Sequence, residues 1–204
     1  MNSYVSTLQE LESLYDAVSK PSLIKETDYI HDVYKPYIQA ASLVVMATAA
    51  TNGLDASPRG DAAGFVHIQN SKTILLPDRR GNNRIDSLLN IVQDPRVGLL
   101  FFIPGVNETL RVNGAARICI DNAVLEQFSV NGQLPRTVIE IAVEAVYFKC
   151  GRALIRSGLW DPERYAGKGE LPTVGQILKE ITSSDFDGEP YDRELPERLL
   201  KTLY

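Results

Sequence analysis

The most informative stretch of this sequence is Leu75–Arg84, which reads LLPDRRGNNR. The apolar run Thr73–Pro77 predicts a strand, and the amphipathic run Arg84–Val92 predicts a helix. A strand therefore leads into a short loop rich in Arg, Asn and Gly, and this loop opens a helix. Guanidinium groups bind phosphate through paired hydrogen bonds, and the start of a helix offers free N–H groups. The loop is thus a candidate anion site, with a solvated basic loop that caps a surface helix as the alternative.

The residue types in this loop suit an anion. Gly81 allows the backbone to approach a ligand closely or to take a positive φ. Asn82 and Asn83 offer amide donors, and Arg80 offers a guanidinium. We expect Arg84 in the first turn of the helix, where the helix dipole disfavours a cation unless an anion is present. The loop is neither a P-loop, because it lacks Gly-Lys-Ser/Thr, nor a dinucleotide fingerprint, because it lacks the spaced glycine trio.

Strand-like runs dominate the middle of the chain. Asn52-Gly53 is a strong hairpin signal, and Gly60 and Gly64 interrupt one of the runs. Sequential strands at hairpin distance favour a mostly antiparallel barrel over a doubly wound parallel sheet. The expected fold class is therefore α+β, mainly β with helices. The six predicted strands are 42–49, 56–68, 73–77, 97–103, 109–120 and 137–148.

Helical patterns flank this central region. The first helix has four apolar residues on one face and is expected to end at Pro21. A second helix, over Asp28–Ala40, is expected to kink at Pro36. In the last quarter of the chain, Thr173 and Gln176 fit a capping box at the start of a helix. The expected organisation is a helical N-terminal extension at 1–40, a core at 41–150, and a helical C-terminal segment at 151–204 that packs on the core or on a partner subunit.

The composition limits the classes of function. The 204 residues carry 21 Lys and Arg against 26 Asp and Glu, a net charge of −5, which disfavours general nucleic-acid binding. No stretch approaches the roughly 20 apolar residues that span a bilayer. The first residues show no basic-then-apolar signal, so a cytoplasmic location and no membrane partner are expected. Two His and two Cys residues are too few for a metal site, and none is expected.

Two further segments place polar side chains on one face of a predicted strand. Arg59 and Asp61 have the same parity, and the small residues around them leave the backbone free to meet a flat ligand. Thr109 and Arg111 alternate with apolar residues on a later strand. A surface ion pair is the alternative for the first pair, and a half-exposed strand is the alternative for the second.

Together these motifs resemble the flavin-binding proteins of the pyridoxamine 5′-phosphate oxidase-like family, in particular the branch described as predicted flavin-nucleotide-binding proteins. The resemblance is good over 41–160 and weak in the flanks. It rests mainly on the loop Leu75–Arg84, on Pro104–Gly114 (PGVNETLRVNG) and on Arg156–Trp160 (RSGLW). The resemblance implies a six-stranded antiparallel split β-barrel of the FMN-binding type, a homodimer, and FMN bound at the subunit interface.

The resemblance also implies roles for individual residues at the phosphate. Arg59 matches a strand arginine that contacts the phosphate in the family. The family's phosphate grip falls on Asn82, Asn83 and Arg84. This chain lacks a further phosphate lysine of the oxidases, and Arg80 or Arg84 is expected to replace it.

Other residues match the part of the family's site that surrounds the flavin ring. The strand end at 76–78 matches one that passes the ring and the ribityl chain, and Thr109 takes the place of a glutamine that reaches the ring in the oxidases. The segment Cys150–Trp160 is a candidate cap on the partner subunit's flavin, in which Trp160 either stacks on a ring or anchors the tail. The complete set of candidate cofactor-binding residues is Arg59, Asp61, Leu76, Pro77, Asp78, Arg80, Gly81, Asn82, Asn83, Arg84, Thr109, Arg111, Arg156 and Trp160.

The resemblance implies a flavin-dependent oxidoreductase that acts on a small molecule, with a small molecule or NAD(P)H as electron donor. No catalytic residue is assigned, because the cofactor carries the transfer while the protein orients it. Pyridoxamine phosphate is not the expected substrate, since the oxidases' C-terminal Arg-x-His is missing. A non-catalytic protein that binds or stores flavin nucleotide is the main alternative. A deazaflavin or haem carrier and a phosphoanion- or RNA-binding domain are the others.

Overall fold

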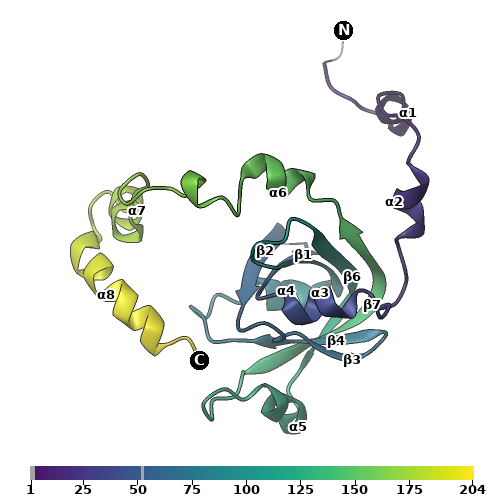
Figure 1. The fold of residues 1–204 in the computed structure, drawn as a ribbon. Helices are drawn as coiled ribbons and strands as arrows, with labels where there is room; N and C mark the ends of the chain where they lie inside the picture. Colours follow the sequence, from purple (N-terminus) through teal and green to yellow (C-terminus); the bar gives the residue numbers. More distant parts are fainter. Residues whose placement is uncertain (1–2, 52) are drawn as a thin grey trace.

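Seven strands form one antiparallel sheet in the computed structural model, which describes residues 3–51 and 53–204 (Figure 1). The strands lie in the order β2-β1-β5-β6-β7-β4-β3, and each pair of neighbours is antiparallel. The antiparallel sheet expected from the sequence is therefore present. The strands are β1 Leu43–Ala50, β2 Gly53–Gly60, β3 His67–Asn70, β4 Thr73–Asp78, β5 Arg96–Phe102, β6 Thr109–Cys119 and β7 Thr137–Lys149.

The expectation of six strands is wrong by one. The run at 56–68 was expected to be one strand, but it contributes to two, because the chain leaves the ladder after Gly60 and Gly64 takes a left-handed φ of 86°. The resulting strands β2 and β3 are the two edges of the sheet, and no ladder between described residues joins them. Hydrogen bonding therefore does not close this sheet into a barrel. The edge strand β2 contains Pro58, and Asn52 of the predicted hairpin turn lies outside the described residues.

The core is built from the alternating apolar residues of the long strands. Val44, Leu99 and Val112 are at most 1 % exposed, and they belong to one cluster with side chains from β4 and β7. Three helices contact this sheet, α3 (Lys35–Ala40), α4 (Asp86–Gln93) and α5 (Asn122–Leu125), and Ile38 of α3 and Ile91 of α4 join the same cluster. Burial of these apolar side chains is the main source of the stability of the fold.

The remaining helices are short and lie in the flanks or in one connection. Pro21 and Pro36 stand in the first turns of α2 and α3, so both prolines begin helices instead of ending or kinking them. A proline is tolerated there because the first N–H groups of a helix have no partner within it. None of the described helices is both long enough and apolar enough to cross a membrane. Besides α3 and α4, the α-helices are α1 Leu8–Glu12, α2 Lys20–Ile24, α5 Asn122–Leu125, α6 Arg152–Ser157, α7 Val174–Ile181 and α8 Gly188–Lys201.

A bulge fixes how β6 and β7 cross. The register of their pairing shifts between Asn113 and Gly114, and a Cβ at Gly114 would overlap the carbonyl oxygen of Ala142 on β7. That oxygen belongs to the backbone of β7, the longest strand, so it cannot move away without disturbing the sheet. Glycine is therefore required at this point by close approach.

We predict that Gly114→Ala destabilises the fold by about 2 kcal/mol or more, because the added methyl group forces the two strands apart. Gly81→Ala is the matched control, since a Cβ at Gly81 meets nothing within 4 Å, and it should change stability by less than about 0.5 kcal/mol. Chemical denaturation of the two variants measures both values. Equal stability of the two variants would contradict the role given to Gly114.

Candidate functional site

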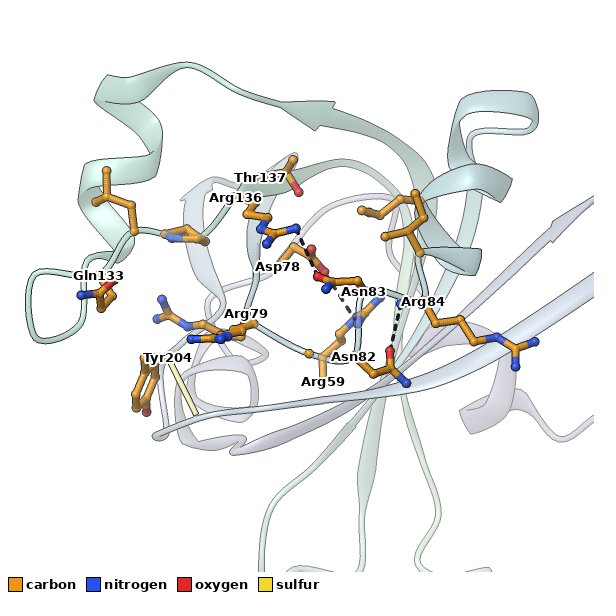
Figure 2. Close-up of a pocket in the computed structure, with 16 residues that line it drawn as sticks. Arg59, Asp78, Arg79, Asn82, Asn83, Arg84, Gln133, Arg136, Thr137 and Tyr204 are labelled. Atoms are coloured by element: carbon orange, nitrogen blue, oxygen red, sulfur yellow. Dashed lines mark hydrogen bonds and ion pairs between the residues drawn. The ribbon is translucent and has the colours of Figure 1, made fainter. Parts of the chain in front are cut away.

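A cavity of about 340 Å³ lies at the end of β4, where the loop after that strand faces the start of β7 (Figure 2). Its volume falls in the range of roughly 300–1,000 Å³ that is usual for small-molecule sites. The register of the sheet creates it, because Asp78 pairs with Thr137 and so brings the two strand ends together. The cavity is lined by Arg59, Asp78, Arg79, Arg80, Gly81, Asn82, Asn83, Arg84, Ile85, Leu88, Gln133, Leu134, Pro135, Arg136, Thr137 and Tyr204.

The guanidinium of Arg59 connects three elements at the floor of the cavity. Its Nη2 donates to Ser87 Oγ of α4 at 3.1 Å, and its Nη1 lies 3.7 Å from Asp78 Oδ1 of β4. The Ser87 hydroxyl in turn donates to Asp55 of β2. Arg59 Nε is buried and has no hydrogen-bond partner among residues 3–51 and 53–204, and the same holds for Thr137 Oγ1. Buried polar groups without partners are rare in folded proteins, so these two atoms indicate where a polar ligand group would bind.

The loop 79–85 is shaped by its two asparagines. Asn82 Oδ1 accepts from the backbone N–H of Arg84 at 2.9 Å, and Asn83 takes a left-handed φ of 63°. Asn83 Oδ1 accepts from Arg136 Nη1 at 3.1 Å, which holds the loop against the start of β7. Asparagine is one of the residues that adopt this backbone conformation most readily.

The sequence predicts Arg84 in the first turn of the helix, but the structure places it before the helix. The helix α4 begins at Asp86, and Ile85 is its N-cap. Arg84 pairs with Asp86, its side chain is 79 % exposed, and Figure 2 shows its guanidinium directed away from the other labelled arginines. Asp86, an anion of the chain itself, therefore occupies the favourable place at the helix N-terminus.

A second ion pair stands at the other side of the cavity. Arg79 Nε donates to Asp61 Oδ2 at 2.6 Å, and Arg79 Nη1 donates to the carbonyl of Phe128 at 2.6 Å. Tyr204 Oη donates to Asp61 Oδ1 at 2.7 Å. Burial raises the pKa of Asp61, but hydrogen bonds from Tyr204, from the Ala62 N–H and from Arg79 outweigh it and hold that pKa below its usual range. Asp61 is therefore an anion that fixes the position of Arg79.

Positive charge exceeds negative charge around the cavity. Five of its lining residues are arginines, against one carboxylate, Asp78. Asp61 and Asp86 pair with Arg79 and Arg84, whereas Arg80 and Arg136 form no ion pair with any described residue. The cavity is thus suited to an anion. No three His, Cys, Asp or Glu side chains among the described residues are grouped so that they could hold a metal ion.

Asp78 is the acidic exception inside this positive site. Burial raises its pKa, and the nearby Arg59 and Arg136 oppose that shift only in part. Its ionised form is therefore less favourable in the folded chain than in the unfolded chain.

The structure places the other candidate residues away from the cavity. Leu76 and Pro77 lie within β4 with buried side chains. Thr109 is buried at the start of β6, and Arg111 Nη1 donates to the hydroxyl of Tyr147 on β7 at 3.1 Å.

The two candidates of the C-terminal segment lie on a different part of the molecule. Arg156 is exposed on α6, and Trp160 Nε1 donates to the carbonyl of Val106 at 2.9 Å. This bond ties the end of α6 to the turn between β5 and β6. Within one chain, neither side chain lines the cavity.

The structure also adds residues that the sequence had not singled out. Arg136 and Thr137 enter the site because β7 pairs with β4, and Ser87 enters as the partner of Arg59. An Asn-Gly turn followed by an arginine at the start of a strand was the available signal for Arg136. Tyr204 had no sequence signal, since it lies 143 residues from its partner Asp61.

The fold and the site define an antiparallel-sheet protein with an arginine-rich cavity at one end of the sheet. The family model for pyridoxamine 5′-phosphate oxidase matches residues 30–150, which include the whole sheet and the loop 79–85. This match spans more than half of the chain, so the chain belongs to the pyridoxamine 5′-phosphate oxidase family. The resemblance seen in the sequence is thereby confirmed. No curated protein is significantly similar to this chain in sequence.

Several solved structures are similar to part of this chain. HupZ of Group A Streptococcus is 19 % identical, with 58 % of this chain and 93 % of HupZ covered and a TM-score of 0.48. General stress protein 26 of Bacillus anthracis is 18 % identical, with 55 % and 88 % covered and a TM-score of 0.41. An FAD-binding protein of Mycobacterium smegmatis is 16 % identical, with 60 % and 97 % covered and a TM-score of 0.41.

We predict that Asp78→Asn becomes more stable than the unchanged protein as the pH rises. The folded chain raises the pKa of Asp78 above 3.8, so the stabilisation present when the carboxyl is protonated is lost as the pH rises through the folded-state pKa. An asparagine keeps the neutral state at every pH. Thermal unfolding from about pH 4 to about pH 7 should show a melting-temperature difference that grows in favour of the variant.

Asp94→Asn is the control of opposite sign. Hydrogen bonds from Arg96 lower the pKa of Asp94 to about 2, so its contribution is present at neutral pH and is lost as the pH falls towards that value. This variant should be less stable than the unchanged protein at neutral pH. The same pH trend in both variants would show that Asp78 is not held in the way described.

Proposed function

We propose that this protein binds FMN, and that the cavity at the end of β4 holds the phosphate group of that cofactor. The observation that carries this proposal is the buried Nε of Arg59, which has no partner in the described residues and lines an arginine-rich cavity. A phosphate monoester is a compact dianion with several acceptor oxygens. It would supply both the missing acceptor and the missing negative charge.

The residues present fit a phosphate group. Arg59 approaches the cavity from β2 and Arg136 from the residue before β7, and the hydroxyl of Thr137 supplies one more buried polar group. The ion pairs of Arg79 with Asp61 and of Arg59 with Asp78 keep these side chains in place before any ligand arrives. A site that is ordered in advance spends less binding energy on ordering its own side chains.

The ring of the flavin would need further residues, and we propose that a second copy of the chain supplies them. Thr109, Arg111, Arg156 and Trp160 lie outside the cavity of their own chain. Apolar side chains on α1, α2, α7 and α8 are exposed in a single chain, and a subunit interface would cover them. A homodimer with FMN at the interface joins both observations. It predicts twice the mass of one chain in solution.

Bound FMN would supply hydride or electron transfer, and the chain would bind and orient it. We propose a flavin-dependent oxidoreductase in the cytoplasm that acts on a small molecule, with NAD(P)H or another small molecule as electron donor. A non-catalytic flavin-binding or storage protein is the alternative. Steady-state oxidation of NADPH and NADH by the FMN-loaded protein separates the two, since a storage protein gives no turnover.

We predict that the protein binds FMN at least about tenfold more tightly than riboflavin, because only FMN carries the phosphate. Arg59→Gln should remove most of that difference, since charged hydrogen bonds contribute about 1.5–3 kcal/mol, or roughly 10- to 100-fold in affinity. Fluorescence titration with the two flavins measures both ratios.

Arg117→Gln is the matched control for this experiment. Arg117 is an exposed arginine of β6 that pairs with Glu140, and it lies outside the cavity, so its replacement should leave the preference for FMN unchanged. Equal affinities of the unchanged protein for FMN and riboflavin would exclude a phosphate site in this cavity.

A further inference from the structure

The last part of the chain leaves the sheet and comes back to it. After α6 the chain passes through α7 and α8, and Figure 1 shows these helices to one side of the sheet, with the last residues returning towards it. The two helices pack closely on each other, because Gly175 and Gly188 meet without side chains between them. Residues 161–203 thus form a unit of their own beside the sheet.

The return to the sheet depends on Tyr204. Among the described residues, Tyr204 Oη to Asp61 Oδ1, at 2.7 Å, is the only hydrogen bond from residues 162–204 to residues before Asp161. The ring of Tyr204 also lies 5.5 Å from the guanidinium carbon of Arg79, within the range of a cation–π contact. One side chain therefore meets both members of the Asp61–Arg79 ion pair.

The Asp61–Arg79 ion pair has further hydrogen bonds besides the one from Tyr204. The side chain of Asp61 is 4 % exposed and that of Arg79 is 16 % exposed, and each has other bonds. The Ala62 N–H donates to Asp61 Oδ1 at 2.7 Å, and Arg79 donates to the carbonyl of Phe128. The ion pair is therefore a preformed receptor, and Tyr204 can leave it without exposing an unpaired buried charge.

Tyr204 is also part of the cavity wall. It lines the cavity together with Arg79 and Gln133, on the side away from Arg84 (Figure 2). A ligand that enters or leaves on this side would pass Tyr204. We propose that residues 161–204 are a strap, latched by Tyr204 onto the Asp61–Arg79 ion pair, that closes one side of the cavity and slows the exchange of its ligand. The second half of this inference rests on the proposed FMN site.

The latch is tested first without any ligand. Tyr204→Phe keeps the ring and removes only the bond to Asp61, and Tyr204→Ala removes the ring as well. Cleavage by trypsin after Lys201, followed by mass spectrometry, reports how often the end of the strap is released. We expect cleavage roughly tenfold faster in Tyr204→Phe, as the loss of a bond to a charged group implies, and faster still in Tyr204→Ala.

Tyr191→Phe is the matched control for the latch. Tyr191 lies on α8 and contacts Phe186 and Arg198 within the strap itself, so cleavage after Lys201 should keep its original rate. The melting temperature of the sheet should stay the same in all three variants. An unchanged cleavage rate in both Tyr204 variants would overturn the latch.

The effect on ligand exchange is tested with FMN itself. The dissociation rate of FMN, followed by the recovery of its fluorescence after dilution, should rise about tenfold in Tyr204→Phe and stay constant in Tyr191→Phe. Faster cleavage with an unchanged dissociation rate would overturn the role in ligand exchange. Failure of every variant to bind FMN would count against the proposed function, and the cleavage rates alone would then decide on the latch.

Discussion

The pairing of β7 with β4 is the constraint on which the site depends. β7 pairs with β6 along one side and with β4 along the other, so its first residues lie beside the last residues of β4. Asp78 is thereby opposite Thr137, and Arg136 comes within reach of Asn83. The backbone ladder between β4 and β7 thus joins Asp78 and Thr137, and a side-chain hydrogen bond joins Asn83 and Arg136. The end of the cavity formed by Asp78 and Thr137 is therefore fixed by the sheet itself.

Three arginines of the cavity wall pair with carboxylates of the chain itself. Asp61 pairs with Arg79 and Asp86 pairs with Arg84, so each of these carboxylates holds the guanidinium of one arginine of the cavity wall. Asp78 differs, because burial makes its charge unfavourable where it stands. Its presence next to Arg59 suits a site that must hold an arginine in one orientation.

The sequence predicted the antiparallel sheet well because apolar periodicity and turn residues are local properties. It also placed Arg59 and the loop that contains Asn82 and Asn83 in one region, and the structure brings them to one cavity. It misplaced Arg84, because α4 begins at Asp86, two residues after the start that the apolar pattern predicted. Arg136 had a local turn signal, but its place beside the loop depends on the pairing of β7 with β4. Tyr204 was out of reach, since the return of a distant segment is set by tertiary packing that no local pattern records.

The proline in β2 limits how two copies of the chain can meet. An outer strand normally presents a row of free N–H and C=O groups to which a foreign strand can add. Pro58 removes one donor from the middle of this row, so extension of the sheet across that border is disfavoured. Association of two chains by strand addition at β2 is therefore disfavoured, whereas the other edge strand, β3, contains no proline. Fibril-like stacking of chains strand by strand is disfavoured at β2 by the same residue.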